Sequence, residues 1–91
     1  MNNQVRMLSA IMFSDMVGYT ALMQEDEKKA KESRDKYRTV LEENIAIHDG
    51  KILQYYGDGA LAVFNSAIQS VLCAVEIQKA LQKTPVVRRW L

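Results

Sequence analysis

The stretch from residue 51 to residue 64 constrains the fold of this 91-residue chain more than any other. Two strand-like runs, 51–56 and 59–64, are separated only by Gly57 and Asp58. Such a short connection favours an antiparallel hairpin, because glycine adopts the positive φ angles that tight turns need. The chain is long enough for one small domain, and the hairpin predicts that this domain contains an antiparallel sheet.

The residues before the hairpin predict one strand and two helices. The apolar run 7–13 shows little alternation, which is typical of a strand covered on both faces. After a loop, residues 19–24 can form a short first helix. A longer helix is predicted for the charged segment that begins at Glu25, because one face of it repeats at helical spacing. The residues of this face are Ala30, Arg34, Tyr37, Leu41 and Ile45. The mixed charges of residues 28–38 are interpreted as the solvated face of this helix.

The residues after the hairpin predict a third helix. Asn65-Ser66 is a favourable N-cap pair for a helix from 67 to about 83, ahead of Pro85. The order β-α-α-β-β-α predicts a ferredoxin-like α+β fold with an antiparallel sheet and helices packed on one face. The full form of this fold ends in another strand, for which the residues after Pro85 are too few. We therefore expect an incomplete sheet, whose edge a partner chain or a continuation covers.

Composition excludes several classes of protein. An apolar content of 48% and a charged content of 25% are those of an ordinary soluble domain. The net charge of +1 gives no electrostatic case for a nucleic-acid partner. No apolar run approaches the roughly 18–20 residues that cross a bilayer. The single cysteine, Cys73, cannot form an internal disulfide, so a reducing, cytoplasmic location is expected.

Two aspartates stand where predicted strands end. Asp15 follows the first apolar run, and Asp58 lies at the tip of the hairpin. Acids at strand ends beside glycines are suited to holding a divalent cation against phosphates. If the two strands are neighbours, both carboxylates converge on one site. Two simpler interpretations remain open, since Asp58 could serve only the turn and Asp15 could cap the following helix.

Three segments together carry a resemblance to a known family. They are FSDMVGYT at 13–20, QYYGDGALAVF at 54–64 and CAVEIQKAL at 73–81. In this order and on these predicted elements, they resemble the N-terminal half of the catalytic domain of class III nucleotidyl (adenylate/guanylate) cyclases. The resemblance runs over about residues 6–85, so that 1–91 is interpreted as a single partial cyclase-homology domain with 86–91 as a tail.

The resemblance implies a two-metal site. Asp15 and Asp58 would be the catalytic carboxylates and, with the main-chain carbonyl of Met16, would hold two Mg²⁺ or Mn²⁺ ions. The implied reaction is attack of a ribose 3′-hydroxyl on the α-phosphorus of a nucleoside triphosphate, which gives a cyclic nucleotide and pyrophosphate for intracellular signalling. The phosphates would lie against the main chain of four residues, namely Val17, Gly18, Tyr19 and Thr20.

The sequence departs from the family pattern in two ways. Family members selective for ATP carry a lysine at the position of Gln54, whose amide brings no charge, so base selectivity stays open although ATP is favoured over GTP. The transition-state asparagine and arginine of the family come from the second half of its domain. We therefore expect little turnover by this chain alone, and we expect its partner to be either a second copy, in a homodimer, or a complementary cyclase half. A homodimer would not supply these residues.

Two other functions are compatible with the sequence. A non-catalytic dimerisation or regulatory pseudo-cyclase module is favoured by Gln54 and by the wide apolar stripe of the last helix. A diguanylate cyclase ranks lower, because the hairpin YYGDGA lacks the second acid that such enzymes carry.

Overall fold

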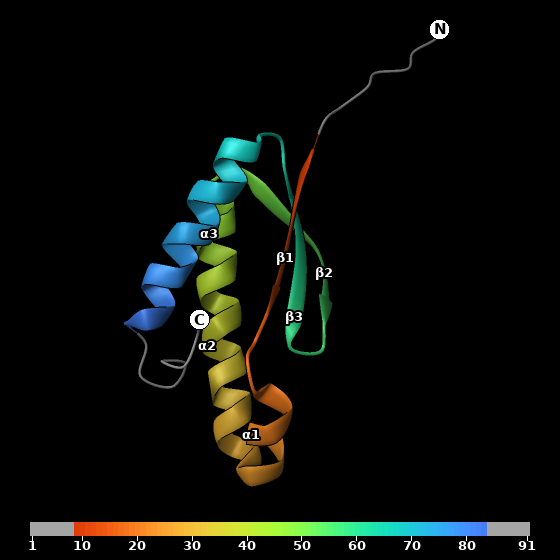
Figure 1. Ribbon diagram of the computed structural model, residues 1–91, viewed down its shortest axis with the longest axis vertical. Helices are drawn as coiled ribbons and strands as arrows, with labels where there is room; N and C mark the ends of the chain where they lie inside the picture. The colour runs from red at the N-terminus through yellow and green to blue at the C-terminus, as the bar shows by residue number, and fades with distance from the viewer. Residues whose placement is uncertain (1–8, 84–91) are drawn as a thin grey trace, which may run out of the picture.

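The computed structural model describes residues 9–83, which form a three-stranded sheet and three helices (Figure 1). The predicted element order β-α-α-β-β-α and the α+β class are confirmed. Residues 7–8 of the predicted first strand, Pro85 and the tail lie outside the described residues. The elements are β1 (Ala10–Asp15), α1 (Tyr19–Glu25), α2 (Glu27–Ile47), β2 (Gly50–Tyr56), β3 (Gly59–Phe64) and α3 (Ala67–Gln82).

The sheet has the strand order β1-β3-β2, with both pairings antiparallel. β2 and β3 form the predicted hairpin, and its turn contains Gly57 at a φ of 56°. Helices α2 and α3 lie side by side on one face of the sheet (Figure 1), as predicted. Within residues 9–83, β1 pairs with β3 alone, so its outer edge carries no strand. A groove of about 210 Å³ runs beside this edge, between β1 and α3.

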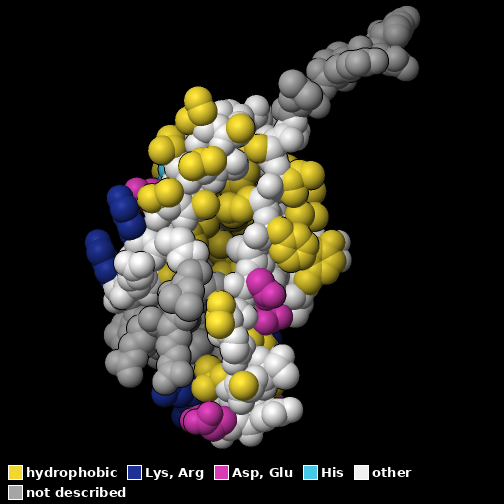
Figure 2. Space-filling model, in the orientation of Figure 1, with side chains coloured by type: hydrophobic (Ala, Val, Ile, Leu, Met, Phe, Trp, Pro, Cys, Tyr) yellow, Lys and Arg dark blue, Asp and Glu magenta, His cyan; other side chains and the backbone are white. Residues whose placement is uncertain are grey.

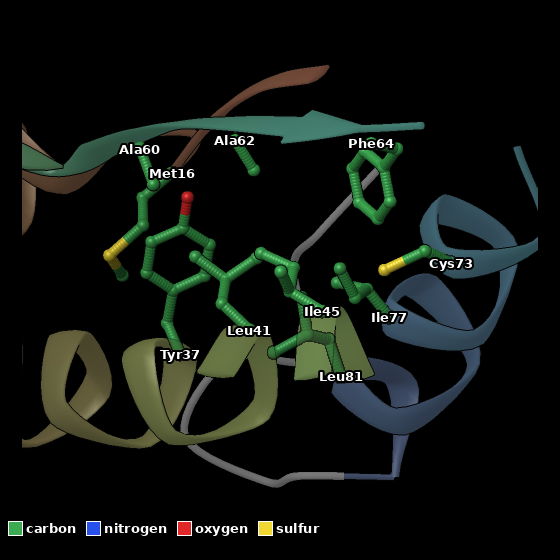
Figure 3. Close-up of a cluster of buried hydrophobic side chains, with 10 residues drawn as sticks. All are labelled: Met16, Tyr37, Leu41, Ile45, Ala60, Ala62, Phe64, Cys73, Ile77 and Leu81. Atoms are coloured by element: carbon green, nitrogen blue, oxygen red, sulfur yellow. The ribbon is translucent and has the colours of Figure 1, made fainter. Parts of the chain in front are cut away.

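The core lies between the two long helices and the sheet (Figure 3). β3 is the central strand, and alternate residues along it point to the helices and are buried. Each helix contributes residues at spacings of about four, which place them on one face. The buried core residues of these three elements are Ala60, Ala62 and Phe64 from β3, Tyr37, Leu41 and Ile45 from α2, and Cys73, Ile77 and Leu81 from α3.

On the face of the sheet opposite the helices, one prediction is wrong. The first strand was expected to be covered on both faces, but its residues alternate between half-buried and exposed. The exposed fractions of Ile11 and Phe13 are 67% and 63%. Periodicity could not reveal this, because residues 10–13 are apolar on both faces of the strand. One face of the sheet is therefore apolar and open among the described residues.

Helix α1 is bounded by Gly18, whose main chain is left-handed, and by Asp26, whose side chain caps the next helix. Gly18 precedes α1 with a φ of 75°, and no side chain caps this helix. Asp26 ends α1 and begins α2, where its carboxylate accepts a hydrogen bond from the main-chain N–H of Lys29 at 3.1 Å. The alternative interpretation of Asp15 as a helix cap is therefore wrong, because Asp15 is the last residue of β1. No helix within the described part of the chain is both long and apolar enough to cross a membrane.

Candidate functional site

The two aspartates lie at the same end of the sheet. In the β1–β3 pairing, Asp15 is directly opposite Gly59, the residue that follows Asp58. This pairing joins residues more than forty positions apart in the sequence, and it brings both carboxylates to the end of the sheet that carries the hairpin turn. Figure 2 shows acidic side chains there, beside the apolar open face. The two strands are thus neighbours, and the two carboxylates lie close together, as was expected in that case.

The electrostatics of Asp58 reflect this closeness. Desolvation raises the pKa of the Asp58 carboxyl above its usual range, although a main-chain N–H that bonds the carboxylate opposes the shift. The negative charge of Asp15 raises the pKa of Asp58 further, as does the hydrogen bond that a protonated Asp58 gives to Asp15. Two carboxylates that repel each other in this way can both ionise more easily when a cation lies between them.

Gly59 brings β1 and β3 unusually close beside the aspartates. A Cβ atom on Gly59 would lie 2.9 Å from the main-chain oxygen of Ser14 and 3.4 Å from Oδ1 of Asp15. The same Oδ1 accepts a hydrogen bond from the main-chain N–H of Met16 at 2.9 Å. The carboxylate of Asp15 is therefore oriented by the chain on both sides, and glycine is the residue that leaves it room.

The four predicted phosphate-binding residues begin two positions after Asp15. Met16 is buried in the core, whereas Val17 is exposed. Gly18 takes the left-handed conformation, and its carbonyl accepts the first hydrogen bond of α1 from Leu22. The remaining two residues of the set, Tyr19 and Thr20, are the first two of α1.

Gln54 lies on β2 at the open face of the sheet. A bulge between Ile52 and Gln54 shifts the register, so that Gln54 is opposite Leu61. Leu61 is in turn opposite Phe13 on β1, and cross-strand neighbours of this kind share one face. The ring of Phe13 also stacks on Tyr56, with centroids 5.7 Å apart. The base-specificity position predicted from the sequence is thus one row away from the aspartates, among apolar side chains.

The chemistry of the donor set fits a hard divalent cation. Nowhere in residues 9–83 do three or more His, Cys, Asp or Glu side chains gather as a metal cage. Two carboxylates beside a main-chain carbonyl are instead typical of Mg²⁺, which retains waters and takes further oxygen ligands from phosphates. Asp15 and Asp58 would supply part of the coordination of such an ion, and water or phosphate oxygens would complete it.

Sequence reasoning missed one residue near the site, Arg38. Residues 28–38 were interpreted as a solvated face, with Arg34 and Tyr37 on the opposite face of the helix, and the solvated interpretation is wrong at Arg38, whose Nε atom is buried. Arg38 reaches the hairpin turn, and its neighbour Tyr37 reaches β1. The available signal was the position of Arg38, four residues after Arg34, which places it on the same face of the helix as Arg34 and Tyr37.

The raised pKa of Asp58 predicts that Asp58→Asn stabilises the metal-free protein at neutral pH. A carboxyl whose folded pKa exceeds its unfolded value contributes stability below the unfolded pKa, and this stability is lost as pH rises through the folded pKa. At pH 7 the asparagine variant should therefore melt at a higher temperature in the presence of EDTA, and the difference should shrink towards pH 4. Glu43→Gln, at an exposed acid of α2, is the control. A lower melting temperature for Asp58→Asn at pH 7 would contradict the prediction.

Comparison with known proteins finds a similar protein. No family model matches the chain. A segment of 77 residues, or 84% of the chain, is 40% identical to Putative adenylate cyclase 3 of Rhizobium meliloti (strain 1021). The chain spans 13% of the length of that protein. Most of this chain is thus homologous to one segment of a protein named as an adenylate cyclase.

Proposed function

We propose that this chain is the metal-binding part of a class III nucleotidyl cyclase domain, which converts a nucleoside triphosphate, ATP in the first place, to a cyclic nucleotide and pyrophosphate. The observation that carries this proposal is the convergence of Asp15 and Asp58 across the β1–β3 pairing. The 40% identity to a protein named as an adenylate cyclase supports it independently. Carboxylates alone would equally suit other phosphate chemistry, and the name of the relative is what favours the cyclase reaction among these.

The residues of the site would have distinct roles. Asp15, Asp58 and the carbonyl of Met16 would hold two Mg²⁺ or Mn²⁺ ions, which when bound lower the pKa of an attacking hydroxyl and neutralise a triphosphate. Asp58 must lose its proton to act as a ligand, so binding should weaken as pH falls through its raised pKa. The main chain of 17–20 would contact the phosphates, and Gln54 would face the base through its amide.

Substitution of either aspartate by asparagine tests this proposal. Mn²⁺ titration at pH 7, followed by the electron paramagnetic resonance signal of the free ion, should show binding by the native chain. Asp15→Asn and Asp58→Asn should each weaken binding at least tenfold, because loss of a direct ligand should cost no less than loss of a supporting contact, about 10–100-fold. Glu43→Gln removes an exposed carboxylate from α2 and should bind as the native chain does. Equal binding by all four proteins would exclude a two-aspartate site.

A non-catalytic dimerisation or regulatory module is the second candidate. The open face of the sheet favours it, because Ile11, Phe13 and Leu53 are each more than half exposed, and apolar patches of this kind commonly mark association surfaces. In either function, a second copy or a complementary cyclase half would cover this face. The same Mn²⁺ titration separates the two functions, since a purely regulatory module needs no cation site.

A further inference from the structure

One face of α2 contacts three segments that carry the candidate site. Arg34, Tyr37 and Arg38 follow the spacing i, i+3, i+4 and therefore lie together on the helix. Their partners are Tyr19 at the start of α1, Ser14 near the end of β1 and Gly57 in the hairpin turn. Two of these partners, Ser14 and Gly57, directly precede the two aspartates in the sequence.

Tyr37 holds the end of β1. Its hydroxyl oxygen lies 2.6 Å from Oγ of Ser14, and its side chain is only 1% exposed. Figure 3 shows the hydroxyl pointing from α2 towards the sheet, near Ala60 and Met16. Burial raises the pKa of Tyr37 to about 12, so the phenol keeps its proton at neutral pH and the contact stays a neutral hydrogen bond.

Arg38 holds the hairpin turn. Its Nη2 donates a hydrogen bond of 2.9 Å to the carbonyl of Gly57. The guanidinium lies 4.3 Å from the ring centroid of Tyr55, and the hydroxyl of Tyr55 donates to Glu42 at 2.7 Å. The plane of the guanidinium is thus set by a ring while its edge binds the turn. Burial of Nε without a partner among the described residues is a cost that these contacts offset.

We propose that Tyr37 and Arg38 are positioning residues, which together fix the separation of Asp15 and Asp58. They are consecutive residues of one 21-residue helix, so the two contacts cannot move independently. The contact of Tyr37 holds the end of β1 in place, and the contact of Arg38 holds the hairpin turn in place. The β1–β3 pairing alone does not do this for Asp58, because it ends at the pair of Asp15 and Gly59. The contact of Arg34 with Tyr19, at 3.4 Å, is longer and plays a lesser part. This inference rests on the cation site proposed above.

Because Arg38 is positively charged, the inference can be tested by whether its removal strengthens or weakens Mn²⁺ binding. The guanidinium binds the turn that carries Asp58, and a positive charge there would repel a bound cation, so its removal should strengthen cation binding if charge alone matters. If position matters more, the same removal should weaken binding, because the hairpin turn is released. The two explanations therefore predict opposite changes in the dissociation constant of Mn²⁺.

The experiment compares Arg38→Met with Lys36→Met in the intact chain. Both substitutions remove one positive charge from α2, but Lys36 is exposed and, within residues 9–83, makes no hydrogen bond or ion pair with the hairpin. Arg38→Met should weaken Mn²⁺ binding about tenfold, as loss of a supporting contact typically does, while Lys36→Met should leave binding unchanged or slightly tighter. Arg38→Lys, which keeps the charge and a donor, should recover part of the loss. Tyr37→Phe, which keeps the ring, should weaken binding in the same direction.

Amide hydrogen exchange in the metal-free protein provides a readout that needs no cation. Arg38→Met should speed exchange at residues 57–59 and leave the core of α2 as it is. Tighter or equal Mn²⁺ binding by Arg38→Met would overturn the inference, and so would faster exchange with unchanged affinity. If the native chain binds no Mn²⁺, the proposed cation site fails, and the exchange rates alone decide whether Arg38 fixes the turn: faster exchange supports this and unchanged exchange refutes it.

Discussion

Replacement of Gly59 by valine should abolish Mn²⁺ binding and destabilise the fold. Even the first side-chain atom would lie 2.9 Å from the main-chain oxygen of Ser14, closer than Cβ atoms normally approach. The neighbouring Oδ1 of Asp15 would be only 3.4 Å away, and the branches of valine would need further space. To accommodate them β1 and β3 must separate at Asp15. We expect a loss of about 3 kcal/mol in the free energy of unfolding, at the upper end of typical overpacking costs.

A second glycine of the same hairpin provides the control. Gly57 has a φ of 56°, and a Cβ built on it meets no atom within 4 Å. Asparagine tolerates the left-handed conformation better than most residues, so Gly57→Asn should keep nearly native stability and Mn²⁺ affinity. Urea unfolding and Mn²⁺ titration of both variants check the prediction. Similar behaviour of Gly59→Val and Gly57→Asn would show that the close approach at Gly59 has no role in the site.

The helices and the hairpin are determined largely by residues that are close in the sequence, so the sequence predicts them. The hairpin follows from the spacing of two apolar runs around Gly57 and Asp58, and the helices follow from their periodicity and caps. The proximity of Asp15 and Asp58 is not local. It depends on a β1–β3 pairing that no short-range pattern specifies, and only the resemblance to a family anticipated it. That these aspartates bind metal stays a prediction.

The features that sequence reasoning missed depend on tertiary contacts. The bulge at Ile52 and Gln54 allows Ile52 and Tyr55, three residues apart, to pack against one core. Simple alternation along a strand cannot place them on the same face. In the sequence Arg38 likewise cannot be distinguished from a surface arginine, because its contact with the hairpin turn depends on the tertiary fold. Charge patterns identify residues that can be solvated, but not those that a neighbouring element covers.

Phe64→Ala should remove a large share of the stability of the fold, whereas Phe13→Ala should have little effect on stability. Phe64 is 1% exposed and contacts the core, and truncation of a buried phenylalanine costs about 3–5 kcal/mol. Domains have roughly 0.05–0.15 kcal/mol of stability per residue, so this loss is a large share of the total for a chain of this length. Phe13 is 63% exposed and stacks on Tyr56, a contact that is worth about 0.5–1.5 kcal/mol.

The two substitutions are chemically identical and lie on adjacent strands, so their difference measures which face of the sheet is covered. Urea unfolding at low protein concentration should give a much larger loss for Phe64→Ala than for Phe13→Ala. If the two losses are equal in dilute monomeric protein, the assignment of the core to the helical face is wrong. If the loss for Phe13→Ala instead grows with protein concentration, a second copy covers the open face in solution, because only association makes stability depend on concentration. An apolar face beside two aspartates would then be an interface that contains the site.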